Sequence, residues 1–268
     1  VLNVIGSVYL QLNNVLLGFM KDVEAVGYFT AATKILVIAM SFSSSLGAVI
    51  MPRTSNLIAE NKMDEFKTLI QKSYDFVLAL AMPLTVGLIF ISPSAILLLS
   101  GEGFASAILT SQIIAFNILT VSIAGVMGFQ VLYPMGRINT VIFCTFIGAI
   151  VNILMNVLLT PVYGHNGTAV AYMLAEVAVT FSMFILGRKY IPIQFFKKEH
   201  LHYIIGSVVM GIGLYFISNS QLDNIMMLTF MLLVGGLTYV GILVVLKDSV
   251  SKIIQKTISQ YFEKKKIL

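Results

Sequence analysis

One uninterrupted stretch of the sequence, from Ile138 to Ala175, contains no Asp, Glu, Lys or Arg. It is long enough for two helices, with Pro161, Gly164 and Gly167 marking a turn between them. A helix needs roughly 20 apolar residues to cross a hydrocarbon core about 30 Å thick. Only 11% of the whole chain is charged, where about 25% is usual for soluble domains, so water could not cover this surface. The stretch therefore predicts a polytopic membrane protein.

Apolar segments of spanning length recur along the whole chain, which predicts an all-α membrane fold with eight transmembrane helices. We expect these helices at about residues 1–20, 26–50, 74–99, 105–132, 138–160, 167–188, 203–219 and 225–246. The chain begins inside the first of them, at Val1 and without a methionine, so we expect it to be the C-terminal part of a longer protein. The one cysteine, Cys144, excludes a disulfide framework or a multi-thiolate metal site within one chain.

Basic residues are distributed very unevenly between the connections of these helices. Fifteen of the 17 Lys and Arg residues lie in the second, fourth and sixth connections and in the tail, and only Lys21 lies in the others. The positive-inside rule then places both ends of the chain in the cytoplasm. We therefore expect a multi-pass membrane protein. Because topology accounts for the net charge of +5, no nucleic-acid partner is needed to explain it.

Two further segments combine apolar and charged residues. Residues 54–72 place Leu57, Ile58 and Phe66 on one face of a helix, which predicts an amphipathic interfacial helix on the cytoplasmic side. The tail, 247–268, mixes isoleucines with lysines. It either rests on anionic headgroups or is an ordinary solvated tail.

Polar residues inside the predicted helices fall into four stripes, each on one face of its helix at about 100° per residue. Such side chains turn away from lipid, toward a hydrated cavity or a neighbouring helix. Four stripes together favour a polar-lined cavity inside the first six helices, although any single residue can instead be a helix–helix contact. The stripes are Asn3, Ser7, Gln11 and Asn14; Thr30, Lys34, Ser41 and Ser45; Thr145, Asn152, Asn156 and Thr160; and Tyr172, Glu176 and Thr180. Of these we expect Lys34, Gln11, Asn14, Asn152 and Asn156 to face the substrate.

Lys34 and Glu176 are the two charges deep inside predicted helices. Measured from the outer side, they lie ~11 Å and ~14 Å deep at about 1.5 Å per residue. A charge near the membrane centre costs several kcal/mol unless it has a partner. We therefore hypothesise a cavity-lining pair in which Lys34 attracts an anionic headgroup and Glu176 is open to protonation. A purely structural salt bridge is the alternative.

The sequence contains no constellation typical of an enzyme, a metal centre or a cofactor site. His165, His200 and His202 lie in predicted loops, and the His-Leu-His pair has no acidic or thiolate neighbour in the sequence to complete a metal site. Asp75 lies near the cytoplasmic interface, where snorkelling accounts for it. We expect a transporter without cofactors.

Several stretches resemble the second half of bacterial polysaccharide flippases of the O-antigen or teichuronic type, in the multidrug/oligosaccharidyl-lipid/polysaccharide exporter superfamily. The first similar stretches are VGYFTAATKI, MPRTSNL and KSYDFVLALAMP. The most recognisable one runs from FQVLYPMGRINT to NILMNVLLTPVYGHNGTAVAYMLAE. The resemblance covers about residues 1–190.

The resemblance implies two six-helix lobes that alternate access around a central cationic cavity. Residues 1–190 would be the second lobe, 191–246 an additional helix pair and 247–268 a basic cytoplasmic tail. The implied location is the bacterial cytoplasmic membrane. The implied cargo is an undecaprenyl-pyrophosphate-linked oligosaccharide, moved from the cytoplasmic to the outer leaflet.

By the same resemblance Lys34 would meet the pyrophosphate, and Glu176 would couple transport to H⁺ or Na⁺. The first helix departs from some members because it carries Asn13 and Asn14 and no acid. The implied partners are the lipid-linked oligosaccharide, membrane lipids and an N-terminal lobe of the same protein.

Three alternatives remain open. A multidrug or peptidoglycan-precursor exporter of the same superfamily is the first, although a drug exporter would favour acids and aromatics in its cavity over Lys34. A polysaccharide polymerase or acyltransferase would carry a large external loop with Arg, His or Asp, whereas every external turn here is short. The third is a channel or scaffold subunit.

Overall fold

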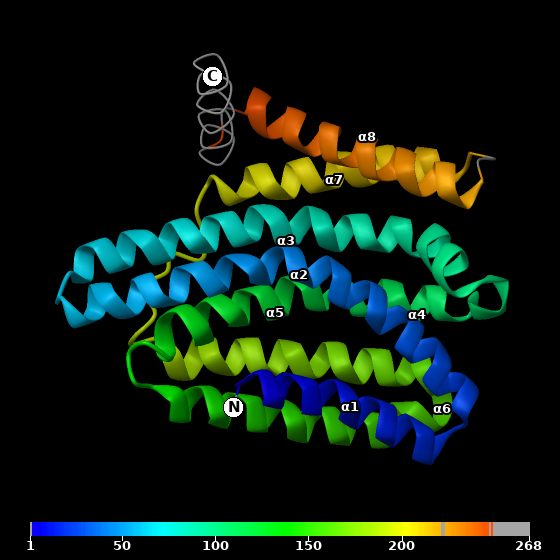
Figure 1. Cartoon of the computed structure of the whole chain (residues 1–268), viewed down its shortest axis with the longest axis horizontal. Coiled ribbons are helices and arrows are strands. Elements are labelled where there is room, and N and C mark those ends of the chain that lie inside the picture. Colours follow the sequence, from blue (N-terminus) through cyan, green and yellow to red (C-terminus); the bar gives the residue numbers. More distant parts are fainter. Residues whose placement is uncertain (1, 221–222, 247, 249–268) are drawn as a thin grey trace, which may run out of the picture.

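The computed structural model describes residues 2–220, 223–246 and 248, and within them the side chains of all residues except 2–10, 44–46 and 48. This described part consists of helices joined by short connections and contains no strand (Figure 1). The helices are α1 (Leu2–Met20), α2 (Val23–Ala59), α3 (Met63–Ser100), η1 (Glu102–Phe104), α4 (Ala107–Ile114), α5 (Asn117–Gly125), η2 (Val126–Leu132), α6 (Ile138–Gly187), α7 (His200–Ser218) and α8 (Asn224–Val245).

Six stretches of the described residues are long and apolar enough to cross a membrane. One of them, the 50-residue α6, turns back on itself at Gly164 and supplies two arms, residues 138–163 and 165–187. With α1 these segments make the eight that the sequence predicts, so the predicted all-α membrane fold is confirmed. The segment predicted at 105–132 is interrupted at 115–116, between α4 and α5, and ends as a π-helix, η2.

The hairpin between the arms of α6 depends on two glycines. Gly164 has φ +57° and ψ −135°, a conformation that residues with a Cβ avoid. Three residues later, the second arm passes the first so closely that a Cβ at Gly167 would lie 2.5 Å from the Leu159 carbonyl oxygen. Just beyond, the Thr160 and Thr168 hydroxyls form a hydrogen bond of 3.0 Å. The turn predicted from the glycines is confirmed.

Replacing Gly167 by alanine is expected to weaken or break this hairpin, because the obstacle is backbone, which cannot move aside as a flexible side chain can. Overpacking of this kind costs about 1–3 kcal/mol. The measurement is the melting temperature of the purified chain in detergent. Gly213→Ala in α7 is the matched control, since nothing lies within 4 Å of the position of its Cβ. Equal melting temperatures for the two variants would contradict the close approach.

The connections alternate between the two ends of the bundle (Figure 1). The α2–α3, η2–α6 and α6–α7 connections lie at one end, on the left of the figure, where most of the basic residues of the described loops gather. The α1–α2 turn, the α3–η1–α4 turn, the α6 hairpin and the α7–α8 turn lie at the other. We call the end that holds the α2–α3, η2–α6 and α6–α7 connections the basic end. This arrangement is the one that the predicted alternation of basic and uncharged connections requires.

Residues 54–72 do not form a separate interfacial helix, and that prediction is wrong. At about 1.5 Å per residue the 37 residues of α2 reach about 55 Å, well beyond a 30 Å hydrocarbon core. The last turns of α2 and the first turns of α3 therefore project together, joined by a tight turn with Asn61 at φ +56°. The apolar face is turned into the protein, because Phe66 and Ile70 are fully buried in a core cluster and Leu57 and Ile58 are partly buried against that cluster.

The last two helices pack beside α3, on its side away from α1 and α6 (Figure 1). The Tyr239 hydroxyl of α8 donates a 2.6 Å hydrogen bond to the Ala79 carbonyl of α3. At Gly211 of α7 an added Cβ would lie 2.9 Å from Val86 of α3. The tail predicted to rest on headgroups lies outside the described residues, apart from Asp248.

Candidate substrate-binding site

The predicted polar stripes of the first two helices form one surface in the structure. The Thr30 hydroxyl of α2 donates a 3.5 Å hydrogen bond to the Asn14 side chain of α1. Because the two helices run antiparallel, the turn with Gln11 lies beside the turn with Lys34. Gln11 and Lys34 are exposed, and Asn14 and Thr30 are half-buried. We call these four residues the α1–α2 polar face. Of the other predicted members, Ser41 is exposed and donates to the Ile38 carbonyl at 2.7 Å, and Asn3, Ser7 and Ser45 lie outside the described side chains.

An apolar groove of about 530 Å³ begins at Ile35, the residue that follows Lys34 in α2. Its α2 wall contains Ile35, Ile38 and Phe42, which follow Lys34 within two turns of the same helix. The opposite walls come from α3, α7 and α8 and are almost wholly aliphatic or aromatic. We call it the α2–α8 groove. A cation at the edge of an apolar groove suits an amphiphilic anion, whose charged group and hydrocarbon chain need such neighbours.

Asn152 and Asn156 do not line a cavity in this structure, contrary to prediction. Both are fully buried, and both donate to the Asn13 side-chain oxygen of α1, at 3.0 and 3.1 Å. The Asn156 side-chain oxygen accepts from the Thr160 hydroxyl, which is itself bonded to Thr168. These five residues form the buried amide network, which joins α1 to both arms of α6. Every member is neutral, so the network holds helices together without a charge for an ion.

Replacing Asn13 by leucine is expected to lower stability, because it removes the shared acceptor of Asn152 and Asn156. Hydrogen bonds between membrane helices average about 0.6 kcal/mol each, and buried donors left without a partner raise the loss to roughly 1–3 kcal/mol. Thermal unfolding in detergent measures the loss. Asn14→Leu is the matched control, since the next residue along α1 makes one long bond, to Thr30. A larger loss in the Asn14 variant would contradict the assigned network.

Glu176 lies half-buried on the second arm of α6. The Thr180 hydroxyl donates to the Glu176 backbone carbonyl at 2.8 Å and to the Thr120 carbonyl of α5 at 3.0 Å. The Glu176 carboxylate has no hydrogen bond or ion pair within the described part of the chain. The stripe with Tyr172 and Thr180 therefore places one acid at the α5–α6 contact.

Lys34 and Glu176 do not form the predicted pair. No salt bridge joins either of them to any residue that the structure describes. Lys34 projects from α2 into the open, whereas Glu176 lies at the contact of α6 with α5. In this conformation the two charges act separately.

A second pocket, which sequence analysis missed, lies between α2, α3, α5 and η2. It encloses about 420 Å³ and contains Ser43, Ser122 and Gln130. The two serine hydroxyls lie 3.0 Å apart, and Gln130 accepts a 2.6 Å hydrogen bond from Ser73. π-helices such as η2 occur often at functional sites. A single glutamine in an apolar run is the only sequence signal, and such a signal is too weak to identify the pocket.

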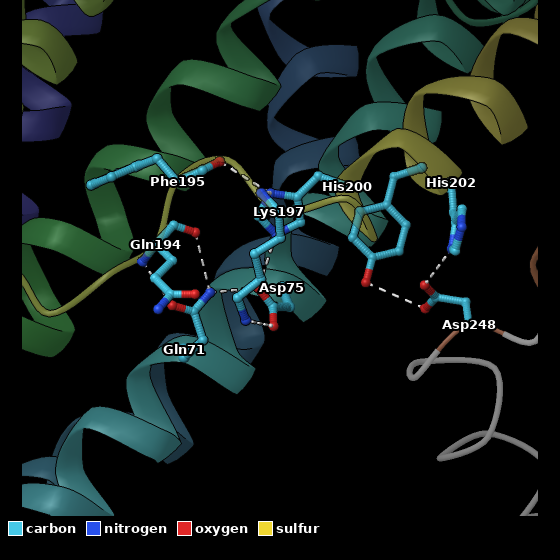
Figure 2. A network of polar contacts seen from close by, with 9 residues as sticks. Gln71, Asp75, Gln194, Phe195, Lys197, His200, His202 and Asp248 are labelled. Carbon is cyan, nitrogen blue, oxygen red and sulfur yellow. Dashed lines mark hydrogen bonds and ion pairs between the residues drawn. The ribbon is translucent and has the colours of Figure 1, made fainter.

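Asp75 of α3 is the centre of a polar cluster at the basic end (Figure 2). One of its carboxylate oxygens lies 3.0 Å from His200 Nε2 and accepts from Gln71 at 2.7 Å, and the other accepts from Lys197 Nζ at 3.1 Å. Gln71 also exchanges hydrogen bonds with the backbone of Gln194. We call these residues the Asp75 cluster. It attaches the α6–α7 connection and the first turn of α7 to α3.

The cluster corrects two interpretations of the sequence. Asp75 does not snorkel, because its carboxylate is mostly buried and has three side-chain partners. The two histidines of the His-Leu-His pair both begin α7 and both have acidic partners: His200 contacts Asp75, and His202 lies 3.2 Å from Asp248 (Figure 2). The partners are 125 and 46 residues away along the chain, which sequence spacing could not indicate. No group of three or more metal-binding side chains occurs among the described residues.

Comparison with known proteins identifies relatives of this architecture. Residues 4–235 match the family described as Lipid II flippase MurJ. Three curated proteins are similar in sequence. An uncharacterized membrane protein of Methanocaldococcus jannaschii is 26% identical over 94% of this chain and 51% of its own length. A probable low-salt glycan biosynthesis flippase of Haloferax volcanii is 24% identical over 63% and 36%. A putative O-antigen transporter of Shigella dysenteriae is 25% identical over 66% and 44%.

The solved structure of a lipid II flippase in an inward closed conformation has the same fold. The superposition has a TM-score of 0.73 at 17% sequence identity, and it covers 88% of this chain and 50% of the solved one. The chain thus spans about half the length, or less, of the relatives that it matches.

Proposed function

The chain belongs to the MurJ family of lipid II flippases, and on that premise we propose that it forms one lobe of a flippase for polyprenyl-pyrophosphate-linked saccharides. The observation that carries the proposal is the position of Lys34. It lies one residue before Ile35 and one turn before Ile38, which line the α2–α8 groove, and on a face that also carries Gln11 and Asn14. A lipid-linked saccharide has three matching parts: an anionic pyrophosphate, a polar sugar and a long hydrocarbon chain.

In this proposal each part of the cargo meets a different surface. Lys34 binds the pyrophosphate, Gln11 and Asn14 bind hydroxyl groups of the sugar, and the polyprenyl chain enters the α2–α8 groove. Placing a lysine without a counterion inside a membrane costs free energy, and such a charge is retained where it faces a cavity or a ligand. This cost supports a substrate-binding role for Lys34.

A second six-helix lobe is proposed to cover the α1–α2 polar face. Residues 1–190 then form one lobe, and α7 and α8 are an additional pair beside α3. The half-length match to the relatives and the exposure of Lys34 support this arrangement. Alternating access would expose Lys34 first to one side of the membrane and then to the other. We place the basic end in the cytoplasm, by the positive-inside rule.

Two cargoes fit the proposed site, and each has an observation in its favour. An undecaprenyl-pyrophosphate-linked oligosaccharide of a surface polysaccharide is favoured by the named functions of the Haloferax and Shigella relatives. A peptidoglycan precursor is favoured by the family and by the solved structure. Both are exported to the outer leaflet, and both carry the same pyrophosphate and polyprenyl parts.

The test is a flipping assay in proteoliposomes with the protein in its natural length. A fluorescent lipid-linked oligosaccharide and fluorescent lipid II are loaded separately, and a membrane-impermeant quencher reports how much has crossed. Transport of either cargo, faster than that of a fluorescent phosphatidylcholine, is the expected result. Transport of neither cargo, with the protein folded and inserted, would refute the proposal.

Replacing Glu176 by glutamine is expected to lower transport severalfold and to remove its dependence on a H⁺ or Na⁺ gradient. The reason is that the Glu176 carboxylate has no partner in the described structure, so that a proton or a cation can neutralise it in one step of the cycle. The measurement is flipping rate with and without each gradient. Thr180→Val is the control, because it alters the same helix contact without changing a charge. An unchanged gradient dependence in the glutamine variant would exclude coupling through Glu176.

A further inference from the structure

A second apolar groove, separate from the α2–α8 groove, opens toward the basic end of the bundle. It encloses about 480 Å³, within the ~300–1,000 Å³ typical of ligand pockets. Its walls come from α3, α5, the second arm of α6, the α6–α7 connection and the start of α7, and are almost entirely apolar. We call it the α5–α7 groove. It shares no lining residue with the α2–α8 groove.

The rim of this groove faces the membrane. Phe181 is 62% exposed and Ile204 is 45% exposed, and both line the groove. Phe196, in the connection above it, is 97% exposed. Large apolar side chains that are this open in a membrane protein meet lipid rather than water. The groove is therefore a lateral opening through which a hydrocarbon chain can enter from the bilayer.

Cations stand at the end of the groove that lies at the basic end of the bundle. Phe184 of α6 and Phe195 of the connection contact each other with ring centroids 4.9 Å apart, and both line the groove. One turn beyond Phe184 come Arg188 and Lys189, and three residues beyond Phe195 comes Lys198. All three cations are exposed and form no ion pair among the described residues, whereas Lys197 is bound to Asp75.

We propose that the α5–α7 groove binds an anionic phospholipid of the leaflet at the basic end. One acyl chain lies between Phe181 and Ile204, and the headgroup phosphate is bound by Arg188, Lys189 and Lys198. Basic pockets between helices on the cytoplasmic side are known to select anionic headgroups. The neighbouring acid Glu199 is exposed and leaves the site net positive.

The groove also connects the lipid to the Asp75 cluster. His200, which contacts Asp75, lines the groove, and so do Tyr74 and Phe195, whose rings meet with centroids 5.4 Å apart. Phe195 in turn provides the backbone carbonyl beside His200 Nδ1, at 3.0 Å. An acyl chain in the groove would therefore press on the residues that hold α7 to α3.

The experiment uses phosphatidylglycerol and phosphatidylcholine that carry a photoreactive group on one acyl chain, each reconstituted with the chain in vesicles of otherwise neutral lipid. We expect phosphatidylglycerol to crosslink preferentially to the peptides 177–184 and 195–204. Changing Arg188, Lys189 and Lys198 together to glutamine should reduce that crosslinking at least tenfold, since each charge near a headgroup contributes about fivefold. The control is the triple glutamine variant at Lys62, Lys67 and Lys72, which removes as many charges at the same end.

A second pair of variants tests the acyl chain. Ile204→Trp fills the groove and should abolish the crosslink, whereas Val208→Trp, one turn further along α7 and outside the groove, should preserve it. Crosslinks spread evenly over all lipid-facing helices would show ordinary annular lipid and overturn the proposal. So would displacement of the probe by undecaprenyl pyrophosphate but not by unlabelled phosphatidylglycerol, which would assign the groove to the cargo. The result is independent of the flipping assay, so either proposal can fail alone.

Discussion

Replacing Lys34 by alanine is expected to reduce flipping of a pyrophosphate-linked lipid more than tenfold. Lys34 is the one charged side chain of the α1–α2 polar face, so its loss leaves the proposed pyrophosphate site without a cation. A charge-assisted hydrogen bond contributes about 1.5–3 kcal/mol, which corresponds to roughly 10- to 150-fold in affinity. Folding should be unaffected, because the side chain is exposed and makes no salt bridge with any described residue. Flipping in proteoliposomes, normalised to inserted protein, measures the effect.

Two variants separate a specific role from a general effect of charge. Lys34→Arg keeps the cation and should retain a substantial part of the rate, although the guanidinium binds phosphate with a different geometry. Lys21→Ala removes an exposed lysine in the α1–α2 turn and should leave the rate unchanged. If Lys34→Ala flips as fast as Lys21→Ala, the pyrophosphate is bound elsewhere.

The sequence predicted those features that depend on local chemistry. Spanning helices follow from runs of apolar residues, and the turn of α6 follows from Gly164, because few other residues adopt its backbone conformation. The alternation of the connections followed from their lysines and arginines. All of these signals lie within one segment of the chain.

The sequence did not predict the contacts between helices that are distant along the chain. The stripe with Asn152 and Asn156 is polar whether it faces water or another amide, and only the position of Asn13 decides between them. Likewise, Leu57 and Phe66 look like a membrane-facing stripe, but the fold packs both of them into or against one core cluster. In both cases hydrophobic periodicity shows that one face of the helix differs in polarity from the rest, but it does not show what packs against that face.

The polar groups of the described bundle divide into two kinds with different physical consequences. The buried amide network around Asn13 satisfies its own members and carries no charge, so it favours one fixed arrangement of α1 and α6. Lys34 and Glu176 are charged and have no ion-pair partner among the described residues, so each favours a ligand or a change of state. A transporter needs both kinds: rigid contacts that move as a unit, and unsatisfied charges whose partners change during the cycle.

Replacing Asp75 by alanine is expected to give the largest loss of stability among the variants considered. Its side chain is only 15% exposed and holds Lys197 and His200, and its removal would leave a partly buried lysine without a counterion. Removing one partner of a buried ion pair costs about 3–5 kcal/mol. The loss should be local, because these partners belong to the α6–α7 connection and to α7. Hydrogen exchange should therefore accelerate in α7 before it does in α1 or α6.

The control for this variant is an ion pair of nearly equal length in a different environment. Lys67 and Asp64 lie 3.2 Å apart, against 3.1 Å for Lys197 and Asp75, but the Asp64 side chain is 98% exposed. Solvent screens the exposed pair, so Asp64→Ala should change the melting temperature little. Asp75→Asn should fall between the two, since an amide oxygen can still accept one hydrogen bond while Lys197 loses its counterion. Equal effects of Asp64→Ala and Asp75→Ala would mean that burial adds nothing to the Asp75 cluster, and that packing alone attaches α7 to α3.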